Sequence, residues 1–288
     1  MNRLDTAKRA QIIRCLVEGS SIRSTVRMTG ASKNTVAKLL VELGAACQKI
    51  MDGAMRNLPC KRIQADEIWS FVGAKQKNVK PHHFDDGGHA GDVWTWTAID
   101  ADTKLVPAWM LGGRDAGAAR DFMEDLAGRL ANRVQLTTDG HKAYLTAVDR
   151  AFGEDIDYAM LVKIYGENTE GQKRYSPAVC LGCKREAISG SPDPDHVSTG
   201  FAGRQNLTVR MSMRRFTRLT NAFSKKVENH AASVALYFTW YNFGRVHQTL
   251  KATPAMAAGV ANHVWSVEEL IGLLEAVEPK STRPAVSN

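Results

Sequence analysis

Two aspartates stand out because each lies in, or at the end of, a run of apolar, β-branched and aromatic residues. Asp66 lies within residues 62–72, and Asp139 ends residues 134–139. An unpaired carboxylate is costly to bury in such a run, and a cation is its usual partner. Two carboxylates at strand ends can hold Mg²⁺ or Mn²⁺, and a pair of such ions clamps the attacking and leaving oxygens of a phosphodiester. These residues therefore predict phosphoryl transfer.

The residues around the two aspartates predict an ordered set of elements. Alternating apolar and polar residues, and then a helical stripe of apolar residues, indicate three strands, a helix and a fourth strand, at 62–72, 93–100, 105–111, 115–130 and 134–138. If the first and fourth strands are neighbours, Asp66 and Asp139 converge. This order is that of the ribonuclease-H-like nucleotidyl transferases, so we expect an α/β fold with a mixed sheet and flanking helices. For either aspartate alone, a strand-end or turn role is the alternative.

The first 50 residues have a pattern of their own. Apolar residues between 6 and 46 fall at helical spacing, with breaks at 19–21 and 29–32, and Ser32 is a predicted N-cap. A short second helix, a glycine turn and a third helix are typical of a helix-turn-helix, in which the third helix enters the major groove of DNA. An ordinary three-helix packing unit is the alternative. The residues predicted to face DNA are Ser32, Lys33, Asn34, Thr35 and Lys38.

Composition limits the possible classes. With 288 residues and 44% hydrophobic content, the chain can bury one large core and a small additional domain. The net charge of +8 fits a polyanionic partner. No apolar run approaches the ~20 residues of a membrane span, and the first residues lack the apolar core of a signal peptide, which predicts a cytoplasmic location. An odd count of five cysteines favours reduced thiols over a disulfide framework.

A basic segment lies in the C-terminal half. Residues 203–226 contain no Asp or Glu, which suits a helix that lies along a phosphate backbone, with a solvated basic face as the alternative. Its arginines, all predicted to bind DNA, are Arg204, Arg210, Arg214, Arg215 and Arg218.

Four segments together resemble the transposases of the IS-one insertion-sequence family. They begin at Asp66, Thr138, Arg204 and Phe223, and read Asp-Glu-Ile-Trp, Thr-Asp-Gly, Arg-Gln-Asn-Leu and Phe-Ser-Lys-Lys-Val-Glu. The resemblance extends over about residues 60–241, with an insertion. It implies an Asp-Asp-Glu catalytic core on a ribonuclease-H-like fold, and Mg²⁺-dependent cleavage and transfer of DNA strands at element ends. It also implies action as a homo-oligomer on double-stranded DNA.

The chain departs from that family at the third carboxylate. The family pattern has a Glu directly before the Arg-x-Asn-Leu run, where this chain has Gly203. The next candidate ligand is Glu228, for which a helix N-terminal position is the simpler explanation. Ser224 is a predicted N-cap, which suggests two helices between positions 203 and 228. The sequence thus leaves open an active transposase, a DNA-binding protein without catalysis, such as a decayed transposase or a repressor, and a nuclease on the same core.

The chain divides into three predicted parts. These are a helix-turn-helix domain at 1–50, a catalytic core at 60–245 with an irregular insertion at about 153–202, and a C-terminal tail with a short helix at 246–288. Within the insertion, Cys180 and Cys183 have the spacing of zinc ligands. Because no second pair follows at zinc-finger distance, free thiols in a loop are favoured over zinc.

Overall fold

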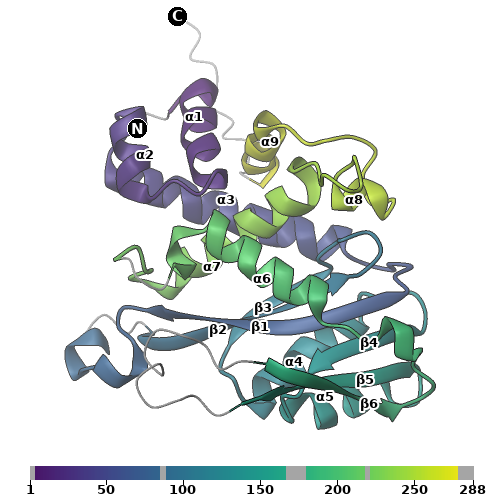
Figure 1. The fold of residues 1–288 in the computed structure, drawn as a ribbon. Coiled ribbons are helices and arrows are strands. Elements are labelled where there is room, and N and C mark those ends of the chain that lie inside the picture. Colours follow the sequence, from purple (N-terminus) through teal and green to yellow (C-terminus); the bar gives the residue numbers. More distant parts are fainter. Residues whose placement is uncertain (1–3, 85–88, 167–179, 218–220, 278–288) are drawn as a thin grey trace, which may run out of the picture.

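A six-stranded mixed sheet forms the centre of the protein (Figure 1). The computed structural model describes residues 4–84, 89–166, 180–217 and 221–277 of the chain. Helices α4 (Ala116–Ala127) and α5 (Ala143–Phe152) cover one face of the sheet, and α6 (Gly200–Ser212) and α7 (Val227–Thr239) cover the other. The protein is therefore a three-layer α/β structure in this region.

The strand order is β3-β2-β1-β4-β5-β6. The strands are β1 (Arg62–Val72), β2 (Gly91–Asp100), β3 (Ala108–Gly112), β4 (Val134–Asp139), β5 (Ile156–Tyr165) and β6 (Cys180–Ser189). The first three are consecutive and antiparallel, β4 and β5 continue parallel to β1, and β6 pairs antiparallel to β5. The prediction that the first and fourth strands are neighbours is confirmed, since β1 pairs with β4. This is a ribonuclease-H-like sheet with flanking helices, as the order of elements predicts.

Strand β1 is covered on both faces, because its alternate residues enter two different cores. Ile63 and Ala65 pack in the core beneath α4 and α5, whereas Ile68 packs in the core beneath α6 and α7. Successive side chains of a strand point to opposite faces. Asp66 and Glu67 must therefore leave β1 on opposite sides.

The segment predicted as an irregular insertion at 153–202 instead extends the sheet. Its described residues form β5 and β6, and the start of α6. Cys180 and Cys183 lie on the edge strand β6, not in a loop, and both are exposed free thiols. The sequence pattern missed β6 because most of its side chains are exposed, so that no apolar periodicity marks the strand.

Three helices form the N-terminal part: α1 (Thr6–Val17), α2 (Ile22–Thr29) and α3 (Lys33–Ala54). The predicted N-cap is confirmed, since the side chain of Ser32 accepts a hydrogen bond from the backbone N–H of Thr35. Gly30 ends α2 with φ of 69°, a left-handed conformation that favours glycine. Helix α3 is longer than the sequence predicts and extends past residue 50, the predicted domain boundary.

Helix α3 joins the N-terminal helices to the rest of the protein. Its buried Leu40 and Leu43 share one core with Ala235 and Leu236 of α7, and this core also includes α9 (Val267–Val277). Arg14 of α1 forms an exposed ion pair with Glu268 of α9. The N-terminal helices therefore do not have a core separate from α7 and α9.

Up to residue 277, the described C-terminal part contains the helices α8 (Pro254–Ala257) and α9, after a turn of π-helix at Trp240–Gly244. Predicted as a tail with one short helix, it instead packs against α1 and α3 through α9. In the part of the chain that the structure describes, no helix is long and apolar enough to cross a membrane.

Gly44 sets the close approach of α3 and α7. A Cβ atom at position 44 would lie 2.4 Å from Cα of Ala232, where no side chain fits without movement. Gly44→Ala should therefore lower the free energy of unfolding by about 1–3 kcal/mol, although alanine favours helices over glycine. Urea unfolding of the full chain measures the change.

Gly53 of the same helix provides the matched control. A Cβ atom there would meet no atom within 4 Å. Gly53→Ala should raise the free energy of unfolding by about 0.5–1 kcal/mol through helix propensity alone. Equal effects of the two substitutions would show that the α3–α7 contact does not limit residue 44.

Candidate active site

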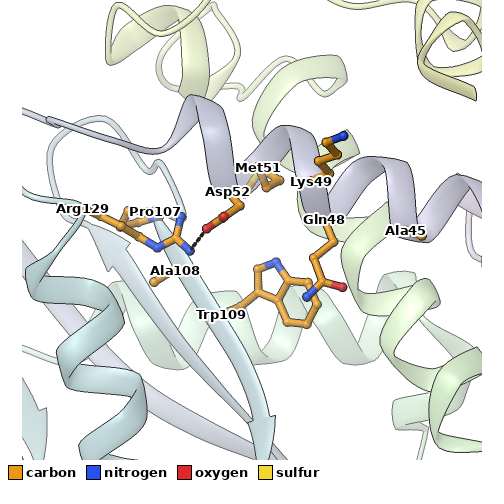
Figure 2. A pocket seen from close by; sticks show the side chains of 9 residues that line it. All are labelled: Ala45, Gln48, Lys49, Met51, Asp52, Pro107, Ala108, Trp109 and Arg129. Carbon is orange, nitrogen blue, oxygen red and sulfur yellow. Dashed lines mark hydrogen bonds and ion pairs between the residues drawn. The ribbon is translucent and has the colours of Figure 1, made fainter. Parts of the chain in front are cut away.

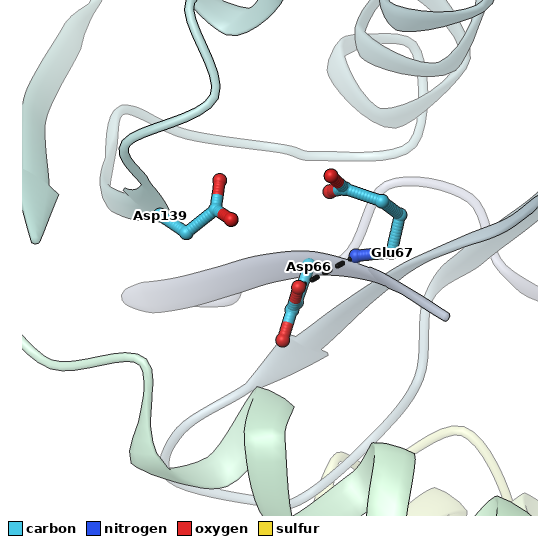
Figure 3. A group of neighbouring side chains, drawn as sticks. All are labelled: Asp66, Glu67 and Asp139. Carbon is cyan, nitrogen blue, oxygen red and sulfur yellow. Dashed lines mark hydrogen bonds between the residues drawn. The ribbon is translucent and has the colours of Figure 1, made fainter. Parts of the chain in front are cut away.

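Asp66 and Asp139 meet at the centre of the sheet. Strands β1 and β4 pair in parallel with Gln64 opposite Thr137, and two further residues along each strand lead to Asp66 and Asp139. One carboxylate oxygen from each of Asp66, Glu67 and Asp139 lies within 4.8 Å of the other two. Figure 3 shows the three side chains. The predicted proximity of Asp66 and Asp139 is confirmed, whereas their role as metal ligands stays a prediction.

Helix α6 holds the carboxylate of Asp66. Asn206 Nδ2 donates to Asp66 Oδ2 at 2.9 Å, and the backbone N–H of Glu67 donates to Oδ1 at 2.8 Å. Burial, and then the nearby charges of Glu67 and Asp139, raise the pKa of Asp66 from its usual 3.8 to about 6. This carboxylate therefore favours a bound proton or a cation.

Asp139 ends β4 and turns the chain toward α5. Its Oδ1 accepts a hydrogen bond of 2.9 Å from the backbone N–H of His141, a turn that fixes the carboxylate. Its Oδ2 lies 3.8 Å from Nη2 of Arg114. One oxygen of Asp139 is thus held by the backbone, and the other faces a cation.

Glu67 is the member of the acidic cluster that sequence reasoning missed. Its carboxylate points away from that of Asp66, to the other side of β1 (Figure 3). Arg114 Nε donates to Oε1 at 2.6 Å and the hydroxyl of Tyr144 donates to Oε2 at 3.0 Å, so both oxygens are engaged. The sequence did contain a signal for Glu67, namely a glutamate directly after an aspartate in an apolar strand. Because successive side chains of a strand point to opposite faces, one of these two carboxylates must enter each of the two cores.

The two aspartates open onto a cleft of about 560 Å³. Its basic members, Arg114, Lys142 and Lys163, lie around the acidic pair. Such a mixture suits an anionic chain that approaches a cation held by carboxylates. The lining residues are Asp66, Arg114, Asp139, Gly140, His141, Lys142, Leu161, Val162, Lys163 and Tyr165.

Gly203 lies one helical turn before Asn206 on α6, on nearly the same face. Asn206 contacts Asp66, and position 203 is exposed, one helical turn away from that contact. A Cβ atom at 203 would meet no atom within 4 Å. Helix α6 therefore has room for a larger side chain at position 203.

Glu228 is not brought to the aspartates. It lies exposed in the first turn of α7, while His230 faces the sheet and lies 3.2 Å from the hydroxyl of Ser70. Two residues turn a helix by about 200°, so Glu228 faces away from the sheet. Ser70 itself is four residues beyond Asp66, roughly 13 Å along β1. Glu228 is therefore not part of the acidic cluster.

The predicted N-cap at Ser224 is wrong, since α7 begins after Lys226 and has no side-chain cap. The hydroxyl of Ser224 instead lies 2.9 Å from Nδ1 of His230 and accepts a hydrogen bond from Arg215. Burial, and then the charge of Arg215, lower the pKa of His230 to about 3. These contacts fix the start of α7 against the end of β1.

The basic segment at 203–226 does not form one helix. Helix α6 ends at Ser212, and a short 3-10 helix, Arg214–Phe216, follows. Arg204 and Arg214 are exposed, whereas Arg210 is half-buried and Arg215 is directed into the protein, toward Ser224. Arg218 lies outside the described residues. Contact of these arginines with DNA stays a prediction.

At the start of α3, Lys33, Asn34 and Lys38 are exposed and Thr35 is half-buried. Lys38 forms a surface ion pair of 3.7 Å with Glu42, one turn further along the helix. Exposure of these polar residues leaves them able to contact a groove of DNA. Contact of this helix with DNA stays a prediction.

A second cleft, of about 340 Å³, lies between α3 and β3 (Figure 2). Trp109 forms one wall, and Asp52 and Arg129 form an ion pair of 2.9 Å across one end. Among the described residues that line it, Asp52 is the only acidic one, and its carboxylate is already paired with Arg129. This cleft is therefore a weaker candidate for phosphoryl transfer than the cleft at Asp66 and Asp139.

No family model matches the chain, and no curated protein matches it. Among solved structures, the chain is similar to the piggyBac transposase in a synaptic complex with hairpin DNA, at 9% identity and a TM-score of 0.37, over 94% of this chain and 70% of that one. It is also similar to the Mos1 strand transfer complex, at 12% identity and a TM-score of 0.26, over 82% of this chain and 78% of that one. The fold assignment rests on the strand order and pairing of this chain.

Proposed function

We propose that this protein is a DNA transposase of an insertion sequence, with a polynucleotidyl transferase site at Asp66 and Asp139. It would bind double-stranded DNA at element ends and at the target, as a homo-oligomer in the cytoplasm. The observation that carries the proposal is the meeting of Asp66 and Asp139 on adjacent parallel strands of a ribonuclease-H-like sheet, with carboxylate oxygens within 4.8 Å.

The residues at this site suit Mg²⁺ or Mn²⁺. Both ions prefer oxygen donors, and the raised pKa of Asp66 indicates a carboxylate that lacks a compensating cation. Asp66 and Asp139 would hold the ion. When bound, such an ion activates the attacking oxygen and stabilises the leaving oxygen of a phosphodiester.

The chain's own residues orient these ligands and the substrate. Asn206 fixes Asp66, and the backbone of His141 fixes Asp139, so that the two carboxylates are held before the ion arrives. Lys142 and Lys163 line the same cleft and would attract the phosphate backbone of DNA. Positioning of the reacting groups is a large part of what such a site contributes.

A DNA-binding protein without efficient cleavage is the second candidate, and Gly203 favours it. Helix α6 presents Asn206 to Asp66 but supplies no third carboxylate at position 203. In that case the chain would be a decayed transposase or a repressor that still binds DNA. A nuclease on the same core would cleave DNA without joining strands.

Metal binding and its pH dependence test the site directly. The folded-state pKa of Asp66, about 6, lies above the usual 3.8, so protonation of Asp66 stabilises the folded chain. This stabilisation is complete at pH values below 3.8. This contribution is lost as pH rises through about 6. An ion must displace that proton, so Mn²⁺ affinity should rise by about tenfold per pH unit up to about pH 6 and then level off.

Titration of Mn²⁺ followed by electron paramagnetic resonance measures this affinity. Asp66→Asn and Asp139→Asn should each weaken binding by at least about tenfold, and Asp66→Asn should remove the dependence on pH. Asp121→Asn, an exposed carboxylate paired with Arg120 on α4, is the control and should bind as the parent does. Parental Mn²⁺ affinity in both site variants would exclude a metal site here.

A further inference from the structure

The guanidinium of Arg114 is held in a fixed place beside the candidate active site. Arg114 lies in the connection between β3 and α4, and its Nε donates to Oε1 of Glu67 at 2.6 Å. Its Cζ lies 4.9 Å from the centre of the Trp94 ring, within the range of a cation–π contact. These contacts fix both the position and the plane of the group.

Glu67 holds Arg114 and is not free to bind an ion. Its side chain is only 1% exposed, and its second oxygen accepts a hydrogen bond from the buried Tyr144. A buried carboxylate is strongly unfavourable without a cation, and Arg114 supplies it. The Glu67 carboxylate is therefore the anchor of Arg114, in spite of its nearness to Asp66 and Asp139.

The other end of the Arg114 guanidinium faces the cleft. Nη2 lies 3.8 Å from Oδ2 of Asp139, too far for a hydrogen bond, and within the described residues the two Nη groups make none. The side chain is 41% exposed and lines the cleft together with Asp66 and Asp139. Up to four N–H donors are thus presented next to the acidic pair.

We propose that Arg114 contacts a phosphate oxygen of DNA in this cleft, and that Glu67, Tyr144 and Trp94 position it for that contact. This inference rests on the proposed function, which brings DNA to the two aspartates. Two carboxylates repel a phosphodiester, and a fixed guanidinium beside them offsets that repulsion. Arginine suits the task because its planar donors match two phosphate oxygens at once.

The test needs a variant that does not leave Glu67 unpaired. Arg114→Gln alone would leave the buried Glu67 carboxylate without its cation and would destabilise the fold. The double variant Glu67→Gln with Arg114→Gln removes one negative and one positive charge, so that the net charge of the chain is unchanged. Thermal unfolding verifies that this variant folds.

The probe is a fluorescent DNA duplex one helical turn long, in Ca²⁺, which limits cleavage. Full-length chains carry Lys33→Ala and Lys38→Ala throughout, so that the predicted helix-turn-helix contributes less to binding. We expect the double variant to bind this duplex about tenfold more weakly than the background chain, with a salt slope smaller by about 0.9. Arg120→Gln, which removes an exposed charge of α4 that is already paired with Asp121, should change the affinity by less than about twofold.

Mn²⁺ binding by the same chains, measured without Ca²⁺ and without DNA, separates this inference from the proposed function. The expected result is weaker DNA binding with Mn²⁺ affinity equal to or tighter than that of the background chain. DNA affinity unchanged in the double variant, with Mn²⁺ still bound, would overturn the role of Arg114 and leave the metal site standing. A background chain that binds neither Mn²⁺ nor DNA would overturn both.

Discussion

Gly203→Glu is expected to raise Mg²⁺-dependent nicking of duplex DNA by about 10- to 100-fold, the range typical when support of a metal ligand is added or removed. Position 203 lies one turn before Asn206, which bonds to Asp66, and a side chain there meets no atom within 4 Å of its Cβ. A glutamate at 203 can therefore extend toward the acidic pair. A third carboxylate would strengthen ion binding and the positioning of the attacking oxygen.

Cleavage of a labelled duplex of element-end DNA by the full chain measures the gain. Gly203→Gln supplies the same length without the charge and should not increase nicking. Asp66→Ala added to Gly203→Glu should abolish the gain. Glu228→Gln should change nothing, since Glu228 faces away from the sheet. A parent chain that already cleaves, and that loses cleavage with Glu228→Gln, would contradict the proposal that position 203 has lost a catalytic glutamate.

Lys33→Ala combined with Lys38→Ala is expected to weaken binding of duplex DNA and to reduce the steepness of its salt dependence by about 1.8, or 0.9 for each phosphate that a lysine no longer neutralises. Both lysines are exposed at the start of α3, next to the cap formed by Ser32. Fluorescence anisotropy at several salt concentrations, on a duplex long enough for a helix-turn-helix, gives the slope.

The full chain must be used, because α3 buries its apolar face against α7 and α9. Lys49→Ala combined with Arg120→Gln removes two positive charges elsewhere, with Lys49 at the other end of α3, roughly 24 Å from Lys33. This control should bind nearly as the parent does. If both double variants have the same slope, the start of α3 does not enter the groove.

Local sequence determined much of this fold. The apolar strands at 62–72 and 134–139, the helix after Asp115 and the cap at Ser32 follow from patterns within a few residues. The order of these elements also predicted that the first and fourth strands are neighbours. Proximity of Asp66 and Asp139 followed from that order, because strand ends on adjacent parallel strands meet at one level of the sheet.

Only the tertiary structure determined the partners of these residues. Glu67 binds Arg114 and Tyr144, which lie 47 and 77 residues further along the chain, and no local pattern indicates such a pairing. The sequence around Ser224 is typical of a helix N-cap, but the Ser224 hydroxyl instead forms hydrogen bonds with Arg215 and His230.

The lengths of elements were determined in the same way. Strand β6 exists through backbone pairing with β5 and not through apolar side chains. Helix α3 continues to Ala54, and its last turns bury Met51 in the core beneath α4 and α5. Hydrogen bonds and burial between distant segments contribute free energy that no short stretch of sequence contains. The sequence by itself thus determined where the two aspartates lie, and the packing of distant segments decided which side chains surround them.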